Sequence, residues 1–187
     1  MADADDARIS DETLIGRTAA GDASAFDRLI RRHQAAVYRF ARAAAPDLGE
    51  AAGEMEEILR DTFLAARRSA GRYRDEPSAR TWLLALTRRV LDRRYPQKGP
   101  EADAVPLREL ARTAGRGFLA EDVSTVAAAF EALPPEDREI LTLCDREYFT
   151  VDEAARVTGL TETAVRTRLH RARLRLLARL KEDGLEG

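Results

Sequence analysis

The last third of the chain contains a long run of apolar residues with helical spacing. Val165, Leu169, Ala172, Leu176 and Leu180 follow one another at intervals of four, three, four and four residues. This spacing places their side chains on one side of an α-helix, whereas a half-buried strand would need strict alternation. The chain is therefore predicted to end in a long helix that buries one stripe against a core.

The remaining circumference of this helix is rich in positive charge. Between residues 164 and 181 there are seven basic residues and no acidic one. The basic residues are Arg166, Arg168, Arg171, Arg173, Arg175, Arg179 and Lys181. Clustered positive charge on a helix is typical of proteins that bind nucleic acid. Duplex DNA is the leading partner, and a helix face that is merely solvated is the alternative.

The residues before this helix predict a helix-turn-helix motif. Residues 150–158 form a short helical pattern that Gly159 can close, because glycine readily adopts the left-handed conformation. Thr161 is suited to cap the start of the following helix. In such motifs the second helix places its N-terminal part in the major groove.

Helical periodicity also dominates the first half of the chain, and strand signals are scarce, so the predicted fold class is all-α. Four helices are expected before residue 96. The first is capped by Ser10 or Asp11, and the second by Asp22. The third covers about 54–70 and the fourth about 78–95. Trp82 and His33 fall on apolar stripes, so we expect a core aromatic and a buried histidine whose hydrogen bonds are satisfied.

Charge and proline content divide the 187 residues into four parts. Residues 1–25 form an acidic segment with a short helix and a net charge of −4, and residues 26–95 form a basic helical domain with a net charge of +5. Residues 96–121 contain three prolines and suggest a flexible linker. Residues 122–187 form the helix-turn-helix domain. Within the linker, apolar side chains that could bind another surface are Leu107, Leu110, Phe118 and Leu119.

The residue inventory narrows the chemistry. With Cys144 as its one cysteine, and His33 and His170 as its two histidines, the chain has neither an internal disulfide nor a zinc-binding pattern. No apolar run approaches the roughly 18 residues that span a bilayer. We find no nucleophile–base arrangement, carboxylate cluster with metal-like spacing or glycine-rich phosphate loop. The prediction is a soluble cytoplasmic protein without metal, cofactor or enzymatic activity.

Two blocks of sequence carry a family resemblance. The later block reads ALPPEDREIL over 132–141 and VRTRLHRAR over 165–173. The earlier block reads AFDRLI over 25–30, EEILRDTFL over 56–64 and RTWLLAL over 80–86. In this order, the blocks resemble the promoter minus-ten and minus-thirty-five domains of a bacterial RNA polymerase sigma factor of the extracytoplasmic-function (ECF) group, sigma-70 family.

The resemblance implies a transcription initiation factor. Such a protein binds core RNA polymerase, directs it to specific promoters and assists promoter melting, and is not itself an enzyme. The implied partners are core polymerase, promoter DNA as duplex and as melted single strand, and an anti-sigma factor. The alternative is a stand-alone helix-turn-helix repressor or activator whose N-terminal helices serve dimerisation or effector binding. A helical hydrolase or nuclease is a third hypothesis.

The resemblance also implies roles for individual residues. Polymerase contacts are expected from Glu57, Arg60 and Asp61. Glu57 and Asp61 share a helix face because they are four residues apart. The melted minus-ten strand is expected to meet Arg72, Tyr73, Arg74, Arg80, Arg88, Arg89 and Arg93. The upstream element is expected to meet Arg166, Thr167, Arg168, His170 and Arg171. Tyr73 can either stack on a base or pack internally.

Several positions depart from the family's usual residues. Arg60 stands where the family usually has Gln, and Arg89 stands where Asn is common. Tyr148 occupies a usual Gly position, and Ala164 replaces the usual Thr of the recognition helix. We expect the fold to tolerate these changes and the recognised promoter sequence to differ.

Overall fold

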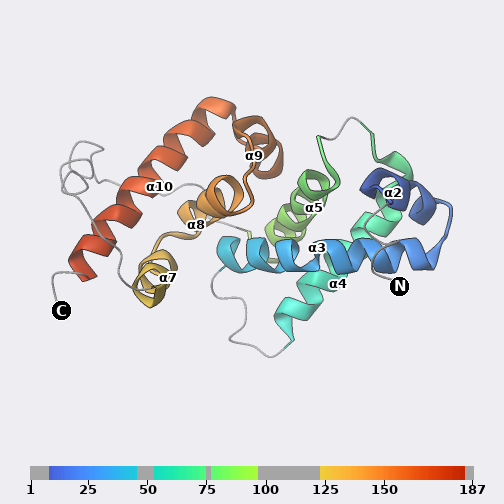
Figure 1. Cartoon of the computed structure of the whole chain (residues 1–187), viewed down its shortest axis with the longest axis horizontal. Coiled ribbons are helices and arrows are strands. Elements are labelled where there is room, and N and C mark those ends of the chain that lie inside the picture. The colour runs from blue at the N-terminus through green and yellow to red at the C-terminus, as the bar shows by residue number, and fades with distance from the viewer. Residues whose placement is uncertain (1–8, 46–52, 75–76, 97–122, 184–187) are drawn as a thin grey trace. The chain divides into compact units, whose positions relative to one another are not determined.

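The computed structural model describes residues 9–45, 53–74, 77–96 and 123–183. Over these ranges the chain forms eight α-helices and no strand, which confirms the all-α prediction (Figure 1). Most residues before Pro96 form one compact unit, and most residues after it form a second. Residues 97–121 of the predicted linker, with its four apolar side chains, and residues 1–8 of the acidic N-terminal segment lie outside the described residues.

The first unit is a bundle of four helices. They are α2 (Asp11–Ala19), α3 (Ala23–Ala44), α4 (Glu54–Ser69) and α5 (Ala79–Arg94). The 3₁₀ turn η1 (Ala70–Arg72) follows α4. Helices α3, α4 and α5 each pack against the other two, and α2 packs mainly on α3. The largest fully buried apolar residues of this unit are Leu14, Ile15, Leu29, Val37, Phe40, Ile58, Leu83, Leu84 and Val90. The predicted apolar stripes therefore meet in one core.

Side-chain caps begin three of these helices. The Ser10 hydroxyl accepts a hydrogen bond from the Thr13 amide of α2, so Ser10 is the cap there and not Asp11. The Asp22 carboxylate accepts from two amides at the start of α3. Ser78 caps α5 in the same way. Each cap satisfies backbone N–H groups that the first helical turn leaves without partners.

Asp11 instead ties α2 to α3. Its Oδ2 lies 2.8 Å from Nε2 of His33, and its Oδ1 accepts a hydrogen bond of 2.9 Å from Nη1 of Arg32. His33 is buried, so the expected core histidine is confirmed. The hydrogen bond with His33, and then that from Arg32, lowers the pKa of Asp11 from 3.8 to about 2 although partial burial acts in the opposite direction.

The second unit contains α7 (Val123–Glu131), α8 (Pro135–Leu141), α9 (Val151–Thr158) and α10 (Glu162–Asp183). One turn of π-helix, η2 (Thr142–Arg146), continues α8 and was not predicted. Helix α10 packs against α7 and α8. On α10, Val165, Ala172 and Leu180 are buried, and Leu169 and Leu176 are half-buried. The predicted stripe therefore faces the core of this unit.

The turn of the helix-turn-helix has the predicted chemistry. Thr150 and Glu153 form a reciprocal capping box at the start of α9. Gly159 ends α9 with φ 73°, in the left-handed region. The Thr161 hydroxyl then accepts a hydrogen bond of 3.2 Å from the Ala164 amide. Helix α9, the turn and the start of α10 are thus fixed by local hydrogen bonds.

Tyr148 is strained. It is the one non-glycine residue with positive φ among the described residues, at 58°, and 84% of its surface is exposed. The left-handed conformation brings the Cβ of an L-residue too close to the following carbonyl oxygen. Because the ring is exposed, its packing offsets little of this strain within the chain.

We expect Tyr148→Gly to raise the free energy of unfolding by roughly 1 kcal/mol, because glycine adopts positive φ without the Cβ clash. Urea denaturation of the purified full-length variant measures this. Tyr148→Ala keeps the Cβ and serves as the matched control, with little or no gain expected. A gain of equal size for alanine would assign the effect to the exposed ring rather than to the backbone.

We expect the contribution of Asp11 to stability to depend on pH. Its folded pKa lies below the unfolded value, so its contribution is complete above pH 3.8 and is lost as the pH falls toward about 2. Asp11→Asn should lower the free energy of unfolding by about 1 kcal/mol at neutral pH and by almost nothing near pH 2. Thermal unfolding across this range, with exposed Asp27→Asn as control, measures the difference. A pH-independent loss would contradict the ionic explanation.

Candidate nucleic-acid and protein interfaces

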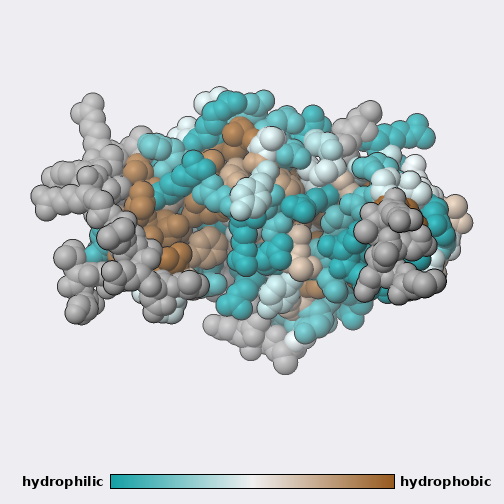
Figure 2. Space-filling view, in the orientation of Figure 1, coloured by the Kyte–Doolittle hydropathy of each residue, from teal (hydrophilic) through white to brown (hydrophobic). Residues whose placement is uncertain are grey.

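The arginines predicted to meet the melted minus-ten strand lie on η1, the loop after it and α5. The sequence-predicted residues Arg72, Arg74, Arg80, Arg89 and Arg93 are all exposed. Arg89 and Arg93 are one helical turn apart, so their side chains leave the same side of α5. Figure 2 shows a mostly hydrophilic surface on the neighbouring helix α3 as well. This arrangement supplies several cations to a polyanion that runs along the unit.

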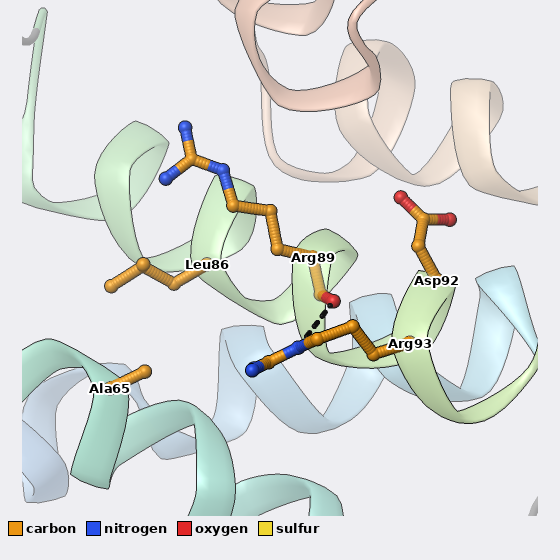
Figure 3. Close-up of a pocket in the computed structure, with 5 residues that line it drawn as sticks. All are labelled: Ala65, Leu86, Arg89, Asp92 and Arg93. Carbon is orange, nitrogen blue, oxygen red and sulfur yellow. Dashed lines mark hydrogen bonds between the residues drawn. The ribbon is translucent and has the colours of Figure 1, made fainter.

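A groove of about 500 Å³ lies between α4 and α5. Ala65 and Leu86 give it an apolar wall, and its charged lining residues are Arg89, Asp92 and Arg93. In Figure 3 the guanidinium of Arg93 points toward Ala65, whereas Arg89 and Asp92 point away from α4. The Arg93 Nε donates a 3.3 Å hydrogen bond to the carbonyl oxygen of Arg89. Such a groove can accept a flat apolar group that carries a negative charge at its edge.

Tyr73 packs inside the unit. Its ring meets that of Trp82 edge-on, with centroids 5.2 Å apart and an interplanar angle of 67°. Trp82 is 6% exposed and is the expected core aromatic. Tyr73 itself is half-buried. Of the two sequence-based interpretations of Tyr73, the internal packing is present, and stacking on a base stays a prediction for the part of the ring that remains exposed.

Arg88 differs from the other arginines of α5. Only 15% of its side chain is exposed, and its Nε lies 3.2 Å from an Asp92 carboxylate oxygen. A residue in this position cannot present its guanidinium as openly as Arg89 or Arg93. The sequence does not predict this difference in exposure, because the arginines of one helix cannot be distinguished until the packed side of the helix is known.

The acidic face of α4 is already occupied by a cation of the same chain. Arg94, at the end of α5, donates to Glu57 Oε2 at 2.7 Å and to Asp61 Oδ2 at 2.6 Å. The shared face predicted for the two carboxylates is thus confirmed. The hydrogen bond and the charge of Arg94 lower the pKa of Glu57. Arg60 is more distant, 3.8 Å from Glu57.

On α10, the five predicted residues divide into two groups. Thr167, His170 and Arg171 are exposed and lie on the side opposite the buried stripe. Arg166 and Arg168 lie on its flanks. Arg166 is exposed and forms an ion pair of 2.6 Å with Glu162, and Arg168 is half-buried. The centre of the exposed face therefore mixes hydroxyl, imidazole and guanidinium groups, which can donate hydrogen bonds to base edges or phosphates.

Two of the seven basic residues counted on α10 form ion pairs within the second unit. Arg175 forms an ion pair with Asp137 of α8, and their side chains are only 13% and 2% exposed. Arg173 pairs with Asp145 of η2, at 2.5 Å and 3.1 Å. Asp137 lies 38 residues from Arg175 in the sequence, and Asp145 lies 28 residues from Arg173. The cationic face is consequently narrower than seven basic residues suggested.

Two further findings concern metal binding and membrane-spanning helices. Among the described residues, no group of three or more His, Cys, Asp or Glu could hold a metal ion. In the same residues, no helix has both the length and the apolar character needed to cross a membrane.

Two protein-family models match this chain. One is described as Sigma-70 region 2 and matches residues 29–99. The other is described as Sigma-70, region 4 and matches residues 125–176. The first match covers α4, α5 and most of α3. It includes Arg72 and Arg74 before α5, and Glu57 and Asp61 on α4. The second covers the helix-turn-helix and the basic half of α10.

Individual proteins agree with these matches. The chain is 34% identical over 169 residues to the ECF RNA polymerase sigma factor SigM of Mycobacterium tuberculosis, covering 89% of this chain and 83% of SigM. The solved structure of CnrH in complex with the cytosolic domain of CnrY is similar, with a TM-score of 0.64, 28% identity and coverage of 92% of this chain and 98% of that chain. The sigma factor RpoE, solved with the anti-sigma factor NepR from Bartonella quintana, shares the fold, with a TM-score of 0.60, 20% identity and coverage of 83% and 96%.

Proposed function

This chain belongs to the extracytoplasmic-function group of the sigma-70 family, and from that membership we propose which of its surfaces meet RNA polymerase and which meet the promoter. It is a transcription initiation factor that binds RNA polymerase and promoter DNA. The observation that carries this conclusion is the presence of both sigma regions in order along one chain. A stand-alone repressor or activator is not favoured, because it would leave the region 2 match unexplained.

The two units have separate tasks in this proposal. Residues 26–95 bind core polymerase and the minus-ten element, and residues 122–187 bind the minus-thirty-five element. Residues 96–121 link them, and the acidic residues 1–25 precede them. The chain supplies binding and orientation, and the polymerase supplies the catalysis. We further propose a cytoplasmic location. We also propose control by an anti-sigma protein, and the complex of RpoE, which has the same fold, with the anti-sigma factor NepR supports this second proposal.

The upstream element meets the N-terminal half of α10. Thr167, His170 and Arg171 are exposed at the centre of that face, and Arg166 and Arg168 flank it. Base-edge contacts in the major groove give sequence preference, and contacts to phosphates fix the register. The pair between Arg166 and Glu162 is exposed, so a phosphate can replace the carboxylate at little cost.

The minus-ten element meets the exposed arginines of η1 and α5. Arg72, Arg74 and Arg80 lie near the start of α5, and Arg89 and Arg93 lie along its later half. A melted strand exposes both phosphates and unstacked bases, which cations and apolar surfaces together can hold. The groove with the apolar wall of Ala65 and Leu86 supports this assignment. Holding the separated strand favours the open state and thereby assists melting.

Core polymerase meets the acidic face of α4, through Glu57 and Asp61 with Arg60 beside them. Two carboxylates on one helix face can pair with basic residues of a partner helix. Both carboxylates are partly exposed, at 48% and 36% of their side-chain surface, and can be reached by a partner.

Arg168→Ala should weaken binding to the cognate minus-thirty-five element by about 1–3 kcal/mol, because a base-reading arginine loses its hydrogen bonds. Fluorescence anisotropy with the cognate duplex and with duplexes substituted at single positions measures this. Arg179→Ala removes the same charge from the exposed end of α10 and serves as the control. An equal loss on all sequences would make Arg168 a phosphate anchor, and no loss would remove it from the interface.

The polymerase assignment is tested by capture of core polymerase on the immobilised full-length protein, followed by run-off transcription from a promoter library. Wild type should bind core and yield promoter-dependent transcripts. Glu57→Gln and Asp61→Asn should each reduce capture, because each removes a charge that faces the partner. Exposed Glu56→Gln is the control on the same helix. If the wild-type chain binds duplex DNA but not core, the stand-alone regulator becomes the better interpretation.

A further inference from the structure

At the end of α5, the side chain of Arg94 contacts the acidic face of α4. The two Arg94 bonds, at 2.7 Å and 2.6 Å, go to two different carboxylates, those of Glu57 and Asp61. These are lengths of charge-assisted hydrogen bonds. Two carboxylates one helical turn apart are spaced so that one planar guanidinium can bridge them. Arg94 therefore holds both predicted polymerase contacts at the same time.

The electrostatics of the three residues agree with this geometry. The hydrogen bond from Arg94 lowers the pKa of Glu57, and the two carboxylates raise the pKa of Arg94. Next to Arg94, burial first and then the charge of Glu54 raise the pKa of Tyr95, which also has a side-chain hydrogen bond with Glu54. Arg94, the last residue of α5, and Tyr95, which follows it, thus both contact carboxylates of α4.

The bridge contributes little to holding the bundle together. The side chains of Arg94, Glu57 and Asp61 remain 32%, 48% and 36% exposed. Ion pairs with this much water access are weak and are screened by salt. The core of α4 and α5 is formed instead by buried apolar residues such as Ile58, Leu83 and Leu84. The bridge can consequently open without loss of the fold.

We propose that Arg94 is an internal competitor for core RNA polymerase, occupying the carboxylate pair that a basic partner segment must reach. This inference rests on the proposed role of Glu57 and Asp61. With Arg94 in place, an approaching cation meets one net negative charge where the sequence offers two. The positively charged guanidinium of Arg94, which lies within hydrogen-bond distance of both carboxylates, also repels that cation. Arg94 therefore sets the affinity for polymerase below the value that the two carboxylates alone would give.

Removal of Arg94 should then tighten the polymerase complex. Arg94→Gln leaves the carboxylate pair without a bridging cation, so we expect roughly 2- to 5-fold tighter binding to core at low salt. The gain should disappear at high salt, because the added attraction is between exposed charges. Arg94→Lys keeps the charge but not the planar fork, and should give an intermediate affinity.

The experiment is equilibrium binding of the full-length protein to core polymerase, measured by anisotropy of a dye on the sigma chain across a salt series. Arg68→Gln is the matched control. It removes one exposed arginine from α4 that has no carboxylate partner among the described residues. Its effect reports the general consequence of losing one positive charge. Circular dichroism and thermal unfolding establish that Arg94→Gln keeps its helices.

A second comparison separates this inference from the polymerase assignment itself. In a Glu57→Gln, Asp61→Asn background, adding Arg94→Gln should no longer change the affinity. If the two carboxylate substitutions alone leave core binding unchanged, the assignment of α4 fails, and the inference fails with it. If those substitutions weaken binding while Arg94→Gln is neutral or weakening, the assignment stands and the competitor role is overturned. A weakening effect of Arg94→Gln would make Arg94 a residue that positions the carboxylates for polymerase.

Discussion

Burial of one apolar stripe per helix is the constraint on which the rest of this protein depends. Each helix with a stripe must turn it toward a partner, because apolar surface left in water is unfavourable. In the first unit the stripes of α3, α4 and α5 face one another. In the second, α10 turns its stripe toward α7 and α8. Once the apolar sides are fixed, every charged side chain is confined to the remaining circumference of its helix.

Pairing between charges then decides which arginines can meet a ligand. Arg175 is committed to the buried carboxylate of Asp137, and Arg94 bridges two carboxylates of α4. Others, such as Arg89 and Arg171, stay exposed on surfaces assigned to DNA. A nearly neutral protein can therefore present a strongly cationic surface, because part of its positive charge is used internally and the rest is concentrated. Clustering matters more for its partners than the net charge of −2.

The two units use ion pairs in different ways. In the second, the pair of Arg175 with Asp137 is almost fully enclosed, so the loss of one partner would leave a charge out of water. In the first, the Arg94 bridge is open to water and exchangeable. The enclosed pair of Arg175 and Asp137 orients α10 against α8. The exposed bridge of Arg94 suits a surface on which a carboxylate exchanges an internal partner for one from another protein.

The sequence by itself determined the helices, their caps and the buried stripes, because these depend on residues close together in the chain. Asp22, Thr161 and Gly159 act where local chemistry placed them. The same local information identified the candidate DNA-binding arginines and, through the family resemblance, the function. The ends of α4, α5 and α9 lie within a residue of the predicted positions, whereas the π-helical turn η2 has no local signal and was not predicted.

Only the tertiary structure decided which of the predicted site residues are available. Arg88 and Arg89 are neighbours in the sequence, yet one is mostly enclosed beside Asp92 and the other is exposed. Arg94 reaches carboxylates 33 and 37 residues away, and Tyr73 packs on Trp82. A periodic pattern gives the direction of a side chain around its own helix. It does not give the side chain that another helix brings opposite, because that depends on how the helices pack.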